Sequence, residues 1–256
     1  MRITVIVDLA LVAWFSLLAV AEFFAARRRA VPEPGGDARL ITNFGLGVLV
    51  LVSNGLLPMV KVGSSWLAQW AGLGLATRFA WPWALALGVL ILADSFASYW
   101  THRALHAVPG LWRIHRVHHS DYSVDVSTSL RSHPLELIVI FPISVAVILL
   151  VGAPPTAVIA AQTIMVAASI WQHADIQLPR LERMLGPWLI TPSIHRVHHS
   201  PERRLHDSNY GELITFWDQL FGTFSRSEGR RRVGLDGQVA RSDRLLEQIW
   251  SPVYGI

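Results

Sequence analysis

Eight of the eleven histidines in this 256-residue chain fall into three short groups whose spacing suits metal binding. Their members are three or four residues apart, so on a helix the imidazoles of each group share one face. Neutral imidazole is a good ligand for zinc, copper, iron and nickel. The groups therefore predict a metal site. They are His102 and His106; His115, His118 and His119; and His195, His198 and His199.

The number of histidines indicates two neighbouring metal ions, because a tetrahedral zinc ion uses at most four protein ligands. His173 and His133 stand at the ends of apolar segments and could supply further ligands, and His206 follows the last group by seven residues. A lone histidine is more often an ordinary surface or core residue, and for His133 and His206 that alternative stays open. The heptapeptides at 114–120 and 194–200 are identical, but the same offset aligns nothing else, which indicates a reused motif and not a duplicated domain.

The composition narrows the chemistry further. The chain has no cysteine, which excludes disulfides, thiolate metal sites and a cysteine nucleophile. Its net charge of +4 comes almost wholly from arginine, since Lys61 is the single lysine. We interpret this charge as membrane topology and lipid headgroup contact. No basic stretch alternates with aromatic residues, so the sequence predicts no nucleic-acid partner.

The elements that must position the histidines read as membrane helices. Hydrophobic residues make up 52% of the chain and charged residues only 16%, where a soluble domain carries about a quarter. The fold class we predict is all-α, a polytopic membrane protein with about four to five transmembrane helices and a cytoplasmic histidine-rich cap that binds the metal. The predicted spans are residues 3–26, 40–60, 82–106, 134–151 and 155–171, with residues 61–81 interfacial.

Topology follows from counting crossings. A cleaved signal peptide is the alternative for the first span, but that span is longer than a signal sequence and ends in Arg27, Arg28 and Arg29. With these arginines inside, Lys61 falls in an outer loop and every histidine lies on the cytoplasmic face. We predict membrane spans and an interfacial segment in 1–84, a catalytic domain in 85–224, and an Arg-rich cytoplasmic tail without fixed structure in 225–256.

Three acidic residues lie near the histidines. Asp94 falls within the third span, where an ionisable group is a functional candidate by default. We predict that it orients an imidazole N–H, with pairing to a neighbouring span as the equally weighted alternative. Glu136, near His133, and Asp175, near His173, are predicted to act in the same way.

The ordered motifs of residues 85–224 resemble the fatty acid hydroxylase / sterol desaturase superfamily. The motifs are Asp94-x4-Tyr99-x2-His102-Arg-x2-His106, Trp112-x2-His115-x2-His118-His119-Ser120, Arg131-x-His133-Pro134-x-Glu136, Trp171-x-His173-Ala174-Asp175-Ile176, Thr191-Pro192-x2-His195-Arg196-x-His198-His199-Ser200, Asn209-Tyr210-Gly211 and Trp217-Asp218-x-Leu220-Phe221-Gly222-Thr223.

The resemblance implies a membrane-bound enzyme that uses two iron ions and O2 to hydroxylate or desaturate a lipid. It implies the eight grouped histidines and His173 as ligands, with Asp94, Tyr99 and Asn209 as candidates that support them. The short gap between His106 and His115 is similar to the hydroxylase and sterol-oxidising branch. The substrate classes it leaves open are sterols or hopanoids, fatty acyl chains, ether lipids and carotenoids.

Electrons must come from a separate ferredoxin- or cytochrome-type donor, since the chain has neither cysteines for an iron–sulfur cluster nor a glycine-rich dinucleotide motif. Other classes fit less well. The His-Glu-x2-His signature of zinc hydrolases is absent, and a transporter would place its ligands near the middle of the bilayer. A non-catalytic or zinc-binding membrane protein that retains the histidine groups is the alternative we keep.

Overall fold

The computed structural model describes residues 2–26, 36–226, 232–236 and 239–254. In these ranges the regular elements are helices, with one isolated bridge between Leu189 and Ile214. The predicted all-α fold is therefore confirmed. Arg27, Arg28 and Arg29 lie outside the described residues.

The helices follow the chain in this order: α1 Arg2–Ala26, α2 Asp37–Asn54, α3 Leu57–Trp70, α4 Leu75–Arg78, α5 Trp83–Ala107, α6 Pro109–His119, the short 3₁₀ helix η1 Val126–Leu130, α7 Pro134–Val151, α8 Pro155–His173, α9 Pro179–Leu185, α10 Pro192–His198, α11 Arg203–His206, α12 Phe216–Leu220, α13 Val239–Ser242 and α14 Leu245–Tyr254. Six of these helices carry proline in the first turn, where its missing N–H costs nothing: α3, α6, α7, α8, α9 and α10.

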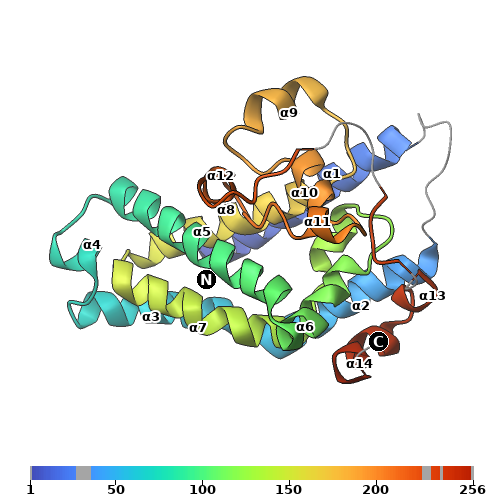
Figure 1. Cartoon of the computed structure of the whole chain (residues 1–256). Coiled ribbons are helices and arrows are strands. Elements are labelled where there is room, and N and C mark those ends of the chain that lie inside the picture. Colours follow the sequence, from blue (N-terminus) through green and yellow to red (C-terminus); the bar gives the residue numbers. More distant parts are fainter. Residues whose placement is uncertain (1, 27–35, 227–231, 237–238, 255–256) are drawn as a thin grey trace.

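Four stretches among the described residues are long and apolar enough to cross a membrane: Val5–Ala25, Asp37–Arg78, Trp83–Ala107 and Pro134–Val151. Figure 1 shows α3, α5 and α7 side by side, with α4 at one end and α6 at the other. α8 is as long as α7 but less apolar, because it packs against α1, α3, α5 and α10 and is covered largely by protein.

The second predicted span requires a correction. The helix does not run unbroken from residue 40 to 60; α2 ends at Asn54 and α3 starts at Leu57, with Pro58 in its first turn. The first half of α2 buries Arg39 and Asn43 against the region after the second histidine group, so the apolar crossing continues into α3. α3 is a helix that packs on α7 and α8 and belongs to the candidate span Asp37–Arg78.

Close backbone contact ties the α7–α8 turn to the loop before α4. Gly152 ends α7 in the left-handed conformation (φ 65°), and a Cβ on it would lie 2.4 Å from the carbonyl oxygen of Leu73. Gly74, which also has a positive φ, sits against it. The carbonyl of Gly152 accepts hydrogen bonds from Gln69 and Thr77. Only glycine permits this approach, which fixes the bundle end away from the histidines.

Small residues let the central helices approach closely. The core between α5, α7 and α8 includes Ala86, Leu90, Ala157 and Ala161, all almost fully buried. Such packing by small side chains is typical of helices that associate in lipid, where no hydrophobic force drives them together. The bundle is therefore a close-packed support for the histidines at the ends of α5 and α8.

The prediction of a tail without fixed structure is wrong for most of the residues that the structure describes there. α14 packs against α2 and α6, and Gln248 and Ser251 on it are buried. The sequence signal was present but weak: an amphipathic stretch of ten residues that holds Pro252.

Candidate metal centre

Four helices bring nine histidines together. The C-terminal turns of α5 hold His102 and His106, and α8 ends at His173. The second and third histidine groups lie on α6 and at the end of α10. All nine side chains are buried. The structure thus unites every histidine of the three sequence groups with His173.

The nine histidines divide into two sets of potential ligand atoms, each gathered within 4.8 Å. One has five members and the other four. The sets are adjacent, since the rings of His119 and His199, one from each, stack with centroids 4.7 Å apart. The five-histidine set is His102, His106, His115, His119 and His198, and the four-histidine set is His118, His173, His195 and His199.

The two identical heptapeptides supply these sets with exchanged roles. On α6, His115 and His119 face the five-histidine set and His118 faces the other; on α10 the i,i+4 pair joins the four-histidine set, and His198 crosses over. His102 approaches its neighbours in one set at 3.0 and 3.1 Å, as His173 does in the other. This local two-fold relation between the sets accounts for the repeated motif. His106, the fifth histidine of the larger set, has no counterpart in the four-histidine set.

Hydrogen bonds at the outer ring nitrogens fix the tautomers. Nδ1 of His102 lies 2.9 Å from the carbonyl oxygen of Tyr210, and Nδ1 of His198 lies 2.7 Å from that of Ser208. A carbonyl oxygen only accepts, so each Nδ1 carries the hydrogen, and in a neutral ring Nε2 is then a bare lone pair. The two Nε2 atoms nevertheless lie 3.0 Å apart.

The four-histidine set shows the same arrangement. His118 and His173 donate from Nδ1 to the carbonyls of Arg131 and Ser169, and their Nε2 atoms are 3.1 Å apart. Burial, followed by the neighbouring imidazoles, lowers the pKa of His118 well below its usual value, and the same holds for His119, His195, His198 and His199. Lone pairs of neutral rings repel at this distance, so each set fits a cation at its centre.

The spacing of the nitrogens suits ligands of a common ion. Two nitrogens bound at 2.0–2.1 Å are about 2.9 Å apart at a right angle and about 3.4 Å apart at the tetrahedral angle. Six close Nε2–Nε2 pairs, three in each set, are 3.0–3.2 Å apart. These distances fall between the two values, so each set fits a bound metal ion.

The three acidic residues differ in what they contact. Glu136 lies 3.1 Å from Nδ1 of His115, as the prediction that it orients an imidazole requires. Asp175 instead pairs with Arg196 at 2.7 Å, on the far side of the third histidine group. It acts on α10 through that arginine and not through His173, because Nδ1 of His173 already bonds Ser169.

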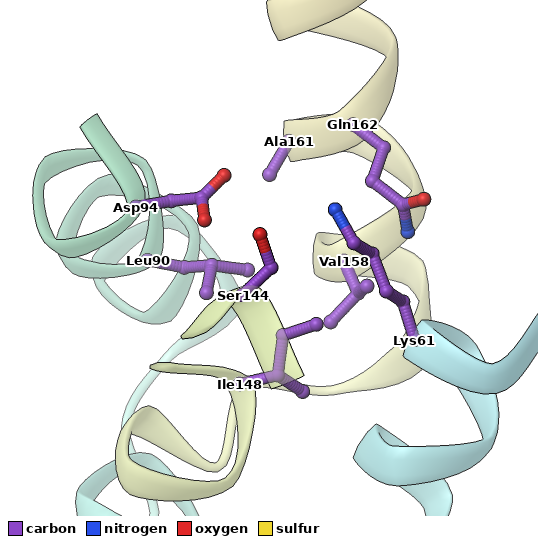
Figure 2. A pocket seen from close by; sticks show the side chains of 8 residues that line it. All are labelled: Lys61, Leu90, Asp94, Ser144, Ile148, Val158, Ala161 and Gln162. Atoms are coloured by element: carbon purple, nitrogen blue, oxygen red, sulfur yellow. The ribbon is translucent and has the colours of Figure 1, made fainter. Parts of the chain in front are cut away.

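Asp94 does not contact an imidazole. Figure 2 shows it pointing from α5 into a water-sized cavity between the helices, opposite Lys61 of α3. Its carboxylate hydrogen-bonds Ser144 of α7. The alternative of a partner on a neighbouring span is therefore the one the structure supports. Lys61, predicted in an outer loop, lies on α3, where its side chain is half-buried and lines this cavity.

Tyr99 and Asn209 support the loop after the third group. The hydroxyl of Tyr99 lies 3.0 Å from that of Thr223 and its ring stacks on Phe221. Asn209, with φ of 53°, donates to the carbonyls of Ile194 and Ser225. Neither touches an imidazole nitrogen; both hold the segment whose Tyr210 carbonyl orients His102.

His133 and His206 lie outside the two sets. His133 caps α7 by accepting from the Leu135 amide and donates from Nε2 to Ile249, so both ring nitrogens are used. His206 stacks on Trp112 at the edge of the site. With His106 and Asp207 it forms a third, more open group. Sequence reasoning missed Asp207, although its position next to His206 was a usable signal.

A further missed residue is Glu212, which hydrogen-bonds Ser98 one helical turn from His102. Burial, and then the charge of Asp94, raises the pKa of Glu212 to about 7. The folded protein thus favours the neutral carboxyl of Glu212, and its protonation stabilises the fold. This stabilisation is complete below the unfolded pKa of about 4.3 and is lost as pH rises through about 7.

Glu212→Gln should therefore stabilise the protein only at high pH. Glutamine stays neutral, so we expect a higher melting temperature than wild type at pH 8 and a similar one at pH 5, measured in detergent. Glu202→Gln, at an exposed glutamate, is the matched control and should change neither value. An equal difference at both pH values would contradict the assignment.

A buried charge network positions the second histidine group. Arg39 on α2 binds Asp121 at 3.0 Å, and Asn43 bonds both Asp121 and the guanidinium of Arg131. Arg131, fully buried, also donates to the Val117 carbonyl on α6 and to the Ser120 hydroxyl. Because its own carbonyl accepts from His118, this network connects α2 to a ligand.

Membrane-length helices that hold two adjacent histidine cages define the class of this protein, a membrane metalloprotein. Residues 87–223 match the fatty acid hydroxylase family model. The match covers more than half of the chain, which belongs to this family; the resemblance read from the motifs is confirmed.

Several similar curated proteins are named for reactions on lipids. Alkylglycerol monooxygenase from Homo sapiens is 29% identical over 209 residues, 79% of this chain and 44% of that protein. The Danio rerio protein of the same name is 30% identical over 217 residues, 82% and 45% respectively. An ornithine lipid hydroxylase from Rhizobium tropici is 30% identical over 176 residues, 67% and 51%. The chain thus spans about half the length of these relatives. No solved structure matches it.

Proposed function

We propose that the chain is a membrane-bound di-iron oxygenase that uses O2 and external electrons to hydroxylate, or desaturate, a lipid C–H bond. The observation that carries the proposal is the division of nine buried histidines into two adjacent sets whose bare nitrogens face each other. Membership of the fatty acid hydroxylase family supports lipid oxidation as the reaction.

The protein's part in the proposed reaction is to hold the metal ions and to exclude bulk water from them. Bound iron would supply the O2 activation that an unactivated C–H bond requires, which no side chain can provide. The histidines would hold two ions side by side, and Nδ1 hydrogen bonds fix the direction of the His102, His118 and His198 rings. Burial of the ligands keeps bulk water away from them.

The substrate is proposed to enter from the bilayer. Aromatic side chains of α5 and α12 pack together on the outside of the bundle just below the ligands on α5, where Phe96, Trp100 and Phe221 are part-exposed. Apolar surface of this kind suits a lipid tail. Relatives named for alkylglycerol and for ornithine lipid make lipids with a polar headgroup the first substrates to test.

The metal site is proposed to face the cytoplasm, where a separate ferredoxin- or cytochrome-type protein would deliver electrons. Exposed arginines on the same side as the third histidine group, among them Arg203 and Arg204, could attract an acidic donor.

The test is lipid mass spectrometry on cells that express wild type or His195→Ala under ¹⁸O2. We expect a lipid with one added ¹⁸O, or one that has lost two hydrogens, only with wild type. The same product with both proteins, at equal expression, would contradict the assignment. A second contradicting result uses wild-type protein that carries two iron ions and is supplied with reduced electron donor and with lipids of the four classes. If this protein forms no oxidised lipid, the assignment is wrong.

The alternative of a zinc-binding or non-catalytic protein is less well supported. A structural zinc site has four tetrahedral ligands, whereas one set here has five histidines. Metal analysis of protein purified from iron- and zinc-supplemented cells separates the two cases.

A further inference from the structure

The C-terminal helix α14 has its amphipathic character reversed relative to a helix on a soluble protein. Its inward face is polar, with Gln248 and Ser251 buried. Its outward face is an apolar stripe at positions i, i+4, i+7 and i+8, and each side chain is more than half exposed: Leu246 71%, Trp250 53%, Val253 67% and Tyr254 67%.

The inward face is joined by hydrogen bonds to the second histidine group. Gln248 accepts from the Ser120 hydroxyl at 2.9 Å, and the Ser251 carbonyl accepts from Arg116 at 2.9 Å. The Ile249 carbonyl accepts from His133, which caps α7. α14 thus contacts the residues on either side of His118 and His119 without touching a ligand nitrogen.

The neighbours of α14 indicate what covers its outward stripe. Leu245 packs on Gly45 of α2, where a Cβ would lie 2.7 Å from its Cδ2 and the leucine side chain would have to shift. α2 and the start of α7 both carry exposed apolar side chains, including Ile41, Val48 and Ile138. Both helices belong to candidate membrane spans, which favours lipid as the cover of the stripe beside them.

The side-chain types of the stripe also fit a membrane surface. Tryptophan and tyrosine favour the boundary between headgroups and acyl chains, and leucine and valine insert below it. Arg241 and Arg244 stand just before the helix, where their side chains are half or more exposed. Arginine there can contact anionic headgroups.

We propose that α14 lies in the plane of the membrane surface with its apolar stripe in the lipid, and that this docking holds the second histidine group in place. The lipid surface then acts as a structural partner of the metal site. The inference requires that the histidines bind metal but does not depend on which lipid is oxidised.

The absence of cysteine makes a direct test simple. Trp250→Cys and Val253→Cys are labelled with a nitroxide in vesicles of phosphatidylcholine and phosphatidylglycerol. Arg203→Cys, at an 85% exposed side chain on α11, is the matched solvent control. We expect O2, which concentrates in lipid, to reach the first two labels several-fold better than a water-soluble nickel chelate, and the order to be reversed at residue 203.

Two outcomes would overturn docking on lipid. One is chelate access at residues 250 and 253 equal to that at residue 203, which would mean that the stripe faces water. The other is exclusion of both reagents together with spin–spin broadening between chains, which would mean that a second copy covers it.

A second experiment tests whether docking of α14 on lipid affects metal binding by the histidines. Leu246→Glu with Val253→Glu should speed metal release to a chelator by about tenfold in vesicles, whereas Leu246→Ile with Val253→Ile should leave the rate near that of wild type. Loss of the lipid-exposed signal at a label on residue 250 with an unchanged release rate would overturn the coupling. Because the readout is metal release, failure here is distinguishable from failure of the proposed oxidation.

Discussion

His118→Ala and His119→Ala are expected each to remove one of two bound metal ions, but from different positions. The residues are neighbours in sequence and belong to the four- and five-histidine sets respectively. Metal content should fall from about two ions to about one per chain in both variants. Lipid oxidation should fall to background, because both ions are needed to reduce O2 in the proposed reaction. Elemental analysis of purified protein and the ¹⁸O assay measure the two effects.

His206→Ala is the matched control, since it removes a histidine at the edge of the site that belongs to neither set. It should keep both ions. If His118→Ala retained two ions, or if wild type bound one ion that both variants lost, the division into two sets would be wrong.

Arg131→Met is expected to lower the free energy of unfolding by about 3–5 kcal/mol, the usual effect of breaking a buried ionic network from one side. The guanidinium is fully buried and donates to Asn43, Val117, Ser120 and Ser242. Methionine keeps much of the volume but removes all four of these buried hydrogen bonds. Thermal and denaturant unfolding in detergent measure the loss.

Arg232→Met is the control, because Arg232 is exposed and its pair with Asp236 should contribute less than about 1 kcal/mol. Acid unfolding adds a second readout. Burial raises the pKa of Asp121, but Arg131 and Arg39 outweigh it and hold the pKa below its usual value. The ionised carboxylate of Asp121 therefore stabilises the fold above the unfolded pKa of about 3.9, and this stabilisation is lost as pH falls below the pKa in the folded protein. Without Arg131 acid unfolding should begin at higher pH; an unchanged midpoint would contradict this.

The histidines could be grouped from the sequence because helical spacing alone sets which side chains share a face. His115 and His119, or His195 and His199, need no tertiary information to be placed together. The division into two sets was not predictable, since it depends on how α6 and α10 face each other across the site. That relation arises from contacts distant in sequence, such as His118 with His173.

Asp94, His133 and α14 show what the sequence left open or missed. Periodicity placed Asp94 on roughly the same face as His102, but eight residues along a helix is about 12 Å, and a cavity with Lys61 lies nearer. His133 lies within a motif that resembles the family, yet it caps a helix. α14 is short and holds a proline. The partners of its polar face, Ser120 and Arg116, lie more than a hundred residues earlier in the chain, so the sequence alone did not show that this face is buried.

The exchanged roles of the two heptapeptides limit how this sequence can change in length. Consecutive residues on a helix are rotated by about 100°, so inserting or deleting one residue before His115 or His195 would turn every ligand of that helix away from its ion. Both ions would be affected at once, because each helix serves both. Length changes should therefore collect in the connections between the histidine groups and be excluded within them.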